Sequence, residues 1–190
     1  MERLEIKFDI SEKGFLDIYK NLSLKKSYPE RTITSIYYDT IDLRYFYDSE
    51  EGICPRIKVR KRFYNKSKDY IFELKKNDFF NRSKISDNSI QDINSFRKKY
   101  AIKNFLYPKV KIIYKRKYYD SLFGRVTIDS NIFFYRLDMN ENCIQQSNLK
   151  KTILEVKNLN VKNKIFILNK VNLNDERISK YCEAILKFYV

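Results

Sequence analysis

The most informative segment of the chain reads Arg56-Ile57-Lys58-Val59-Arg60-Lys61-Arg62-Phe63-Tyr64. Successive side chains of a β-strand point to opposite faces, so the cations Lys58, Arg60 and Arg62 would share one face and mostly apolar residues the other. Three neighbouring cations repel one another, and such a face is expected to meet water, counter-charges or a polyanion. The segment therefore predicts a strand with one cationic and one apolar face.

Charged and apolar residues alternate in the same way in four further segments, 3–8, 72–75, 124–129 and 154–157. A single strand of this kind fits an ordinary sheet whose charged face lies in solvent. Five such strands, with acids and bases mixed, instead favour a closed antiparallel barrel that has a charged lumen and an apolar outer wall covered by helices. The expected fold class is therefore α+β.

Composition narrows the range of partners and of chemistry. The 39 lysines and arginines outnumber the 24 acidic residues, and the resulting net charge of +15 predicts an anionic partner: nucleic acid, acidic lipid or phosphorylated small molecules. The chain contains no histidine, which excludes a His-based catalytic triad and an imidazole metal ligand. A bound metal would therefore be a hard ion held by carboxylates, such as Mg²⁺ or Mn²⁺.

Length and cysteine usage bound the organisation of the protein. The 190 residues include no linker-like segment, so a single domain over 1–190 is expected. Three widely spaced cysteines without a CxxC motif predict reduced thiols and no zinc site. No apolar run approaches membrane-spanning length and the N-terminus has no signal-peptide core, so we expect a cytoplasmic protein without a membrane segment.

Hydrophobic periodicity predicts the secondary structure. We expect strands at 3–8, 32–39, 56–64, 70–76, 109–119, 125–134 and 152–158. We expect helices at 12–22, 86–99, 162–171 and 176–188. Ser11 would cap the first helix, and Ser86 or Asp87 the second. Segment 42–47 would be a short strand or a turn of helix, and 140–147 a polar connection.

Eight short motifs, rich in charged residues and tyrosines, follow one another along almost the whole chain. They are Arg3-x-Glu5-x-Lys7-Phe8, Tyr37-Tyr38-Asp39-Thr40-x-Asp42, Lys58-Val59-Arg60-Lys61-Arg62-x-Tyr64, Phe72-Glu73-Leu74-Lys75-Lys76, Tyr114-x-Arg116-x-Tyr118-Tyr119, Gly124-Arg125-Val126-Thr127-Ile128-Asp129, Leu154-Glu155-Val156-Lys157 and Ile178-Ser179-Lys180-Tyr181. None is specific alone. In their order and spacing they resemble the VTC domain, the polyphosphate polymerase module within the triphosphate tunnel metalloenzyme (CYTH-like) superfamily.

The resemblance implies an eight-stranded antiparallel β-barrel, a triphosphate tunnel with a charged lumen and flanking helices. It implies a phosphotransferase that uses the γ-phosphate of ATP to extend inorganic polyphosphate, with Mn²⁺ or Mg²⁺ as cofactor. A triphosphate or nucleoside triphosphate hydrolase of the same fold, and a non-catalytic polyphosphate-binding module, remain open as alternatives. Partner subunits are not predicted.

The resemblance also assigns roles to individual residues. The catalytic residues that would grip the transferred phosphoryl group are Arg60, Arg62, Arg116 and Arg125. The further phosphate-binding residues would be Lys7, Lys58, Lys75, Tyr114, Lys157, Arg177, Ser179 and Lys180. Glu155 would bind the metal. The supporting carboxylates, which would offset the repulsion among the cations, are Glu5, Glu73 and Asp129.

One motif departs from the superfamily pattern, because Arg3 stands where the first acid of an ExExK motif is found. Loss of that acid removes a potential ligand and favours a single metal. An SPX domain and membrane helices, which couple synthesis to translocation, are not expected in this chain.

Simpler readings stand beside several of these assignments. Glu155 taken alone could be a solvated strand carboxylate, and Ser179 could cap the last helix, alone or alongside a phosphate contact. Tyr114 and Tyr118 are as compatible with packing as with phosphate binding, and Tyr37 and Tyr38 are interpreted as packing residues. A basic, aromatic-rich chain also fits an RNA or single-stranded DNA binder, in which bases stack on exposed rings. Because most aromatic residues fall on the face opposite the cations, nucleic acid is not the expected partner.

Overall fold

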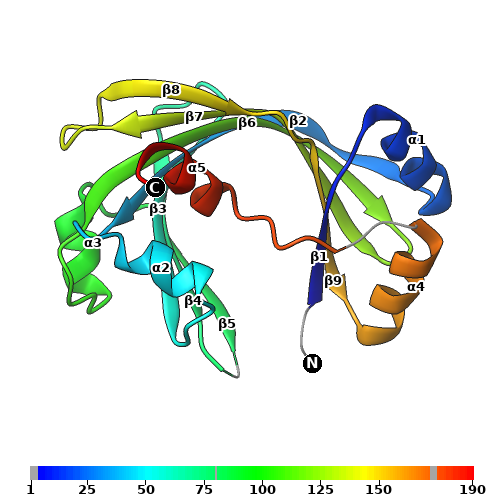
Figure 1. The fold of residues 1–190 in the computed structure, drawn as a ribbon, viewed down its shortest axis with the longest axis horizontal. Coiled ribbons are helices and arrows are strands. Elements are labelled where there is room, and N and C mark those ends of the chain that lie inside the picture. The colour runs from blue at the N-terminus through cyan, green and yellow to red at the C-terminus, as the bar shows by residue number, and fades with distance from the viewer. Residues whose placement is uncertain (1–3, 80, 172–174) are drawn as a thin grey trace. The chain divides into compact units, whose positions relative to one another are not determined.

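A computed structural model describes residues 4–79, 81–171 and 175–190 (Figure 1). Arg3, which takes part in the first motif, lies outside the described residues. The strands are β1 (Leu4–Asp9), β2 (Lys25–Asp39), β3 (Arg56–Tyr64), β4 (Tyr70–Asn77), β5 (Arg82–Asp87), β6 (Tyr107–Ser121), β7 (Gly124–Leu137), β8 (Cys143–Leu149) and β9 (Ile153–Leu159). The helices are α1 (Glu12–Asn21), α2 (Arg44–Glu50), α3 (Ile93–Lys99), α4 (Val161–Val171) and α5 (Lys180–Phe188).

These strands belong to one sheet. Eight of them follow the order β1-β9-β7-β6-β2-β3-β4-β5, and β8 pairs with β7 outside that path. Each strand pair whose register is described is antiparallel. The predicted α+β class with an antiparallel sheet is therefore confirmed, whereas closure of the sheet around a lumen stays a prediction.

The chain divides into two compact units, each built from several segments. The first unit comprises Met1–Thr32, Tyr114–Ile132 and Leu149–Ile178, and the second comprises Ile33–Ile113, Phe133–Asn148 and Ser179–Val190. The long strands β2, β6 and β7 contribute residues to both units. The expectation of one domain over 1–190 stays a prediction.

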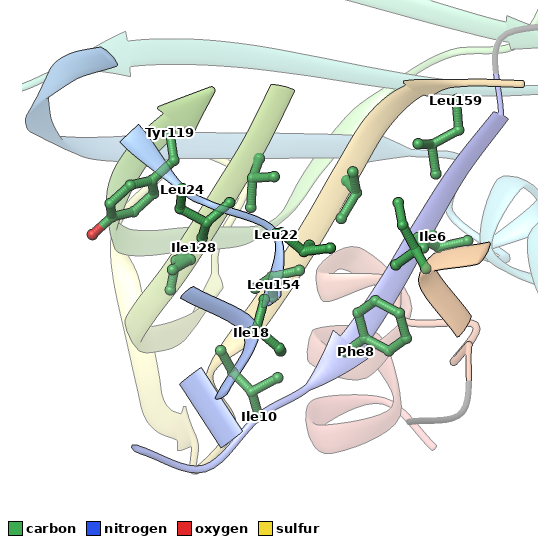
Figure 2. Packing of buried hydrophobic residues seen from close by; sticks show 13 residues of the cluster. Ile6, Phe8, Ile10, Ile18, Leu22, Leu24, Tyr119, Ile128, Leu154 and Leu159 are labelled. Carbon is green, nitrogen blue, oxygen red and sulfur yellow. The ribbon is translucent and has the colours of Figure 1, made fainter. Parts of the chain in front are cut away.

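Apolar residues of the first unit pack on one side of its strands (Figure 2). Ile6 and Phe8 alternate with charged residues along β1, and both are almost fully buried. Ile18 and Leu22 of α1 pack against this cluster, and Ser11 caps α1 as predicted by accepting a hydrogen bond from the Gly14 amide (Oγ–N 3.1 Å). The apolar face of these strands is thus covered by helix, while their charged residues point the other way.

The second unit repeats this division of faces. Val59 of β3 lies opposite Leu74 of β4, and neither residue is accessible to solvent. Phe72 stacks on Phe96 of α3, with ring centroids 5.1 Å apart. The next register pair, Arg60 and Glu73, therefore lies on the opposite face. The alternation predicted for the segment 56–64 is confirmed.

Two expected elements are wrong. Segment 86–99 was expected to be one helix, but Ser86 and Asp87 end strand β5, and α3 begins only after Asp92, whose carboxylate accepts from the Asn94 amide (2.9 Å). Asp87 pairs with Phe72 of β4, so long-range strand pairing overrides the helical spacing. Segment 140–147 was expected to be a connection, but β8 covers most of it; its mostly exposed, polar side chains leave no hydrophobic period to detect.

The boundaries of three further elements differ from expectation. Strand β2 begins at Lys25, in a largely exposed stretch that lacks an apolar period. Of the two alternatives for segment 42–47, the helix is the one found, but α2 runs from Arg44 to Glu50. At its first turn the Asp39 carboxylate accepts from the Tyr45 and Phe46 amides (both 2.9 Å). Helix α5 begins at Lys180 rather than near 176. Within the part of the chain that is described, no helix is long and apolar enough to cross a membrane.

Candidate functional site

The predicted site residues comprise the phosphate-binding cations, the metal-binding glutamate and the supporting carboxylates. They are divided between the two units. The first unit contains Glu5, Lys7, Tyr114, Arg116, Arg125, Asp129, Glu155, Lys157 and Arg177. The second contains Lys58, Arg60, Arg62, Glu73, Lys75, Ser179 and Lys180. Each unit is described on its own.

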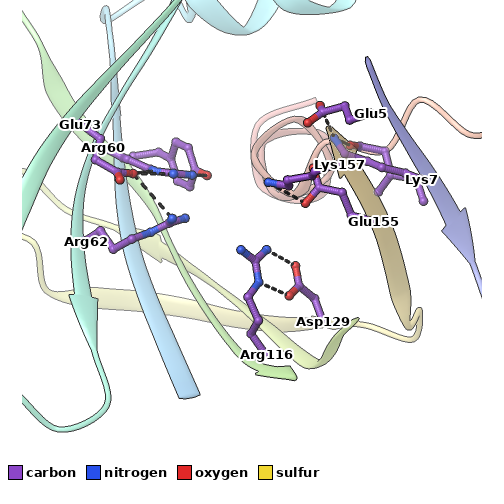
Figure 3. Close-up of polar contacts among 11 residues, drawn as sticks. Glu5, Lys7, Arg60, Arg62, Glu73, Arg116, Asp129, Glu155 and Lys157 are labelled. Carbon is purple, nitrogen blue, oxygen red and sulfur yellow. Dashed lines mark hydrogen bonds and ion pairs between the residues drawn. The ribbon is translucent and has the colours of Figure 1, made fainter. Parts of the chain in front are cut away.

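In the second unit, Glu73 is a single buried carboxylate shared by three cations. Figure 3 shows two of them, Arg60 and Arg62. Arg60 donates from Nε to Glu73 Oε2 (2.5 Å) and also contacts that oxygen through Nη2. Arg62 Nη1 lies 3.6 Å from the same oxygen, and Lys84 of β5 pairs with Oε1. Sequence reasoning missed Lys84, because its segment was not recognised as a strand. We name Arg60, Arg62, Glu73 and Lys84 the Glu73 cluster.

The electrostatics of the Glu73 cluster follow from its burial. Burial raises the pKa of Glu73, but the nearby charges of Arg60 and Arg62 and the hydrogen bond from Lys84 outweigh it and lower the pKa to about 2. Glu73 is therefore ionised at neutral pH. The cluster therefore contains one negative and three positive charges, a surplus of positive charge. Its carboxylate is shielded from water, since Glu73 is only 2% exposed.

Lysines form a row beside this cluster. Lys58 of β3 lies opposite Lys75 of β4, and Lys75 in turn lies opposite Lys84 of β5. Like charges directly opposite each other on a sheet destabilise it unless a counter-charge is present. Because Lys75 lies two residues after Glu73, the row shares a face with the cluster. Cations gathered on one face raise the local positive potential.

Tyr37 contacts the Glu73 cluster from β2, the neighbour of β3 on the side opposite β4. It lies opposite Arg60 and accepts a hydrogen bond from Arg60 Nη1 (2.9 Å), while Ser35 accepts from Arg62 Nε (3.1 Å). Burial raises the pKa of Tyr37, but the charges of Arg60, Arg62 and Lys75 together lower it to about 7. The interpretation of Tyr37 as a packing residue is incomplete. Its ring does stack on Tyr181 of α5 (centroids 5.0 Å apart), yet its hydroxyl belongs to the charged face.

Helix α5 brings its first turn to the same face. Lys58 Nζ donates to Ser179 Oγ (3.0 Å), and that oxygen also caps α5 by accepting from the Cys182 amide (3.4 Å). The reading of Ser179 as a helix cap is therefore confirmed. Lys180, the first residue of α5, is half-buried. A helix N-terminus favours negative charge, so α5 adds to the positive potential made by Lys58.

In the first unit, Arg116 forms a two-pronged ion pair with Asp129 (Figure 3). Its Nε and Nη2 atoms lie 2.5 and 2.6 Å from the two carboxylate oxygens. Burial lowers the pKa of Arg116, but Tyr114 and Asp129 raise it further, so the guanidinium stays charged. The centroid of the Tyr114 ring lies 5.3 Å from the guanidinium carbon, which faces the ring. This arrangement fixes the orientation of the Arg116 guanidinium.

Carboxylates and lysines alternate across β1 and β9 of the same unit. Glu5 lies opposite Lys157, and Lys7 opposite Glu155. Within each strand, Lys7 Nζ lies 3.6 Å from Glu5, and Lys157 Nζ lies 3.1 Å from Glu155. Lys7 also donates to the Ile178 carbonyl (3.0 Å), which anchors the segment before α5.

Two further predicted residues of the first unit are exposed. Arg125 of β7 lies opposite Lys157 in the register, so two cations again face each other across a strand pair. Arg177 lies just before Ile178 on the segment that leads to α5.

Whether these residues fit a divalent metal can be judged from the available oxygen donors. Among the residues that the structure describes, no group of three or more acidic or cysteine side chains could hold an ion alone. Glu155 offers one carboxylate, on a residue that is 8% exposed. Thr127 lies opposite it on β7, and its buried Oγ1 has no hydrogen-bond partner among the described residues. Because Mg²⁺ is commonly held by one or two carboxylates together with substrate phosphates, this donor set fits such an ion.

Comparison with known proteins identifies the family of the chain. A family model described as the VTC domain matches residues 3–91 and 80–189, so the chain belongs to the VTC domain family. A search of proteins with curated descriptions gave no match.

Solved structures share the fold at low sequence identity. A proposed adenylate cyclase from Bacillus halodurans has a TM-score of 0.61 at 13% identity, with 100% of both chains covered. The PH1819 protein from Pyrococcus horikoshii has a TM-score of 0.56 at 16% identity, covering 98% of this chain and 99% of that one. HpAC1 from Hippeastrum, described with a dominant triphosphatase activity, has a TM-score of 0.55 at 11% identity, covering 100% and 98%. The predicted fold of the triphosphate tunnel proteins is confirmed.

Proposed function

We propose that this protein is a phosphotransferase that extends inorganic polyphosphate with the γ-phosphate of ATP. The observation that carries the proposal is the surplus of positive charge around Glu73, where three cations share one ionised carboxylate beside a row of lysines. Such a face needs an anion of high charge density, and polyphosphate carries about one negative charge per phosphate.

Arginine is suited to this ligand because its planar guanidinium offers two parallel hydrogen bonds to a phosphate group. Arg60 and Arg62 hold their guanidinium groups against Glu73 in the second unit, and Arg116 holds its group against Asp129 in the first. Prior orientation lowers the entropy lost when phosphate binds. Lysines contribute positive charge but no planar, two-pronged hydrogen-bond geometry. Those proposed to do so are Lys7, Lys75, Lys157 and Lys180.

The proposed reaction needs no acid–base residue of the histidine type. A terminal phosphate oxygen of the polyphosphate chain attacks the γ-phosphorus of ATP, the bond from that phosphorus to the β–γ bridging oxygen breaks, and ADP leaves with the bond electrons. Phosphoryl transfer depends mainly on positioning and on neutralising charge. Arg60, Arg62, Arg116 and Arg125 would supply both. Glu155 would hold a divalent ion, Mn²⁺ or Mg²⁺, which when bound neutralises charge on the nucleotide phosphates.

Hydrolysis of a triphosphate is the second candidate. It is favoured by the likeness to HpAC1, which is described with a dominant triphosphatase activity. The same cations would then position a water as nucleophile. A binding module without turnover would use them as well.

The test is incubation with ATP and Mn²⁺ followed by gel detection of long polyphosphate and separate assays of ADP and free phosphate. A polyphosphate ladder supports the polymerase, and free phosphate equal to ADP without a ladder supports the hydrolase. Arg60→Ala should abolish either product, and the exposed Arg82→Ala, which lies outside the Glu73 cluster, is the matched control. Unchanged turnover in Arg60→Ala would remove Arg60 from the mechanism.

A further inference from the structure

Thr127 carries a buried hydroxyl that the described structure leaves without a hydrogen-bond partner. The residue is 2% exposed, and its Oγ1 is shielded from solvent. Buried polar atoms are almost always paired with protein or ordered water, because an unmade hydrogen bond leaves the desolvation of the group uncompensated. A valine has nearly the same shape and no such penalty. Its burial therefore calls for a partner that the described residues do not provide.

The position of Thr127 indicates what that partner is. In the register of β7 and β9, Thr127 lies directly opposite Glu155, and Glu155 lies opposite Lys7 of β1. Residues opposite each other on one face have Cβ atoms about 4.5–5.5 Å apart. The hydroxyl and the carboxylate are therefore neighbours on the charged face of the first unit.

The charged groups around Thr127 have other partners. Lys7 Nζ donates to the Ile178 carbonyl, and Lys157 lies 3.1 Å from Glu155. Asp129, two residues further along β7 on the same face, is held by both prongs of Arg116. These charged neighbours of Thr127 already have interactions of their own, and no described residue is a hydrogen-bond partner of its oxygen. This leaves room for an external partner.

We propose that the Thr127 hydroxyl is a second protein ligand, beside Glu155, of the divalent ion that accompanies the triphosphate. The inference rests on the metal-dependent part of the proposed function. A hydroxyl is a hard oxygen donor of the kind Mg²⁺ and Mn²⁺ prefer, and a Ser or Thr hydroxyl holds Mg²⁺ beside phosphates in P-loop enzymes. It is also neutral. A second carboxylate at this position would repel the phosphates, whereas threonine adds a ligand without adding negative charge.

The test measures metal binding rather than turnover. Mn²⁺ is titrated into the full chain with saturating inorganic tripolyphosphate, and free Mn²⁺ is followed by electron paramagnetic resonance. We expect Thr127→Val to weaken Mn²⁺ binding about tenfold, the scale seen when groups that support a metal site are removed. Thr127→Ser, which keeps the hydroxyl, should bind Mn²⁺ as the parent does.

Thermal unfolding of the ligand-free variants supplies a second readout. Because Thr127→Val removes an uncompensated hydroxyl and keeps the side-chain shape, its melting temperature should equal or exceed that of the parent. A lower melting temperature than that of Thr127→Ser would show that the hydroxyl has a partner within the chain, and would overturn the inference.

Glu155→Gln separates this inference from the proposed function. If Glu155→Gln loses Mn²⁺ binding and Thr127→Val binds like the parent, the role of Thr127 is overturned and the metal site at Glu155 stands. If neither variant changes Mn²⁺ binding, both the metal site and the Thr127 ligand are overturned. Weakened binding in both variants, with Thr127→Ser unchanged, supports the inference.

Discussion

Lys58 and Lys75 lie directly opposite each other on β3 and β4, on the face that also carries Arg60 and Glu73. Two like charges in this position repel each other, and the sheet tolerates them best when an anion lies between or beside them. Lys58 is partly engaged by Ser179 at the first turn of α5. The register of β3 and β4 thus places two lysines opposite each other, and this arrangement favours the proposed anionic ligand.

Binding of a polyanion should stabilise the protein strongly. Inorganic tripolyphosphate at about 100 times its Kd should add about 2.7 kcal/mol to the free energy of unfolding, because it binds the folded chain only. Differential scanning fluorimetry measures the shift, with sodium chloride at matched ionic strength as the control. Equal shifts with both salts would mean that only general screening acts on these charges.

Glu73→Gln should destabilise the ligand-free protein. The change leaves Arg60 and Arg62 buried without their shared counter-charge, and breaking a buried pair costs about 3–5 kcal/mol. Tripolyphosphate should recover much of that loss, because it supplies the missing negative charge. Glu5→Gln is the matched control: its ion pair with Lys7 is long, at 3.6 Å, and partly exposed, so it contributes little. Urea denaturation gives both free energies.

The ionisation of Tyr37 should appear near neutral pH. Its pKa is lowered from 10.0 to about 7, so between these values the unfolded chain binds the proton that the folded chain has lost. The stability that this group contributes is complete above pH 10 and is lost as the pH falls through about 7.

Tyrosinate absorbance in the near ultraviolet measures this step directly. Tyr37→Phe should remove it, whereas Tyr28→Phe, at an exposed position of the first unit, should leave it in place. Bound tripolyphosphate should move the midpoint to higher pH, because its negative charge offsets the field of Arg60 and Arg62. A titration without a step near pH 7 would contradict the arrangement around Tyr37.

Arg116→Lys should destabilise the protein. Lysine keeps the charge but cannot make the two parallel contacts to Asp129, which are 2.5 and 2.6 Å long. We expect a loss of about 1.5–3 kcal/mol in unfolding free energy, the range for hydrogen bonds to charged groups. Weaker tripolyphosphate binding should accompany it. The control is Lys115→Arg, at the exposed neighbouring position of β6. If both variants are as stable as the parent, the two-pronged contact of Arg116 with Asp129 has no special role.

Much of the charged face could be predicted from local pattern. A strand places alternate residues on alternate faces wherever it occurs, so the segment 56–64 already separated Arg60 and Arg62 from Val59. The motif order likewise indicated the family and the acids Glu73, Asp129 and Glu155. The two wrong elements failed for different reasons. Strand β8 is polar and exposed and gives no local signal. At 86–99 the local spacing imitates a helix, although long-range pairing makes Asp87 part of a strand.

Which residues lie opposite one another could not be read from the chain. Cross-strand register depends on contacts between segments far apart in sequence, and a shift of one residue would move every side chain to the other face. Only the folded structure therefore places Lys84 on Glu73, the Tyr37 hydroxyl on Arg60, and the Thr127 hydroxyl beside Glu155. The composition of the charged face is a local property of alternating strands, whereas its partnerships are set by the packing that holds those strands in register.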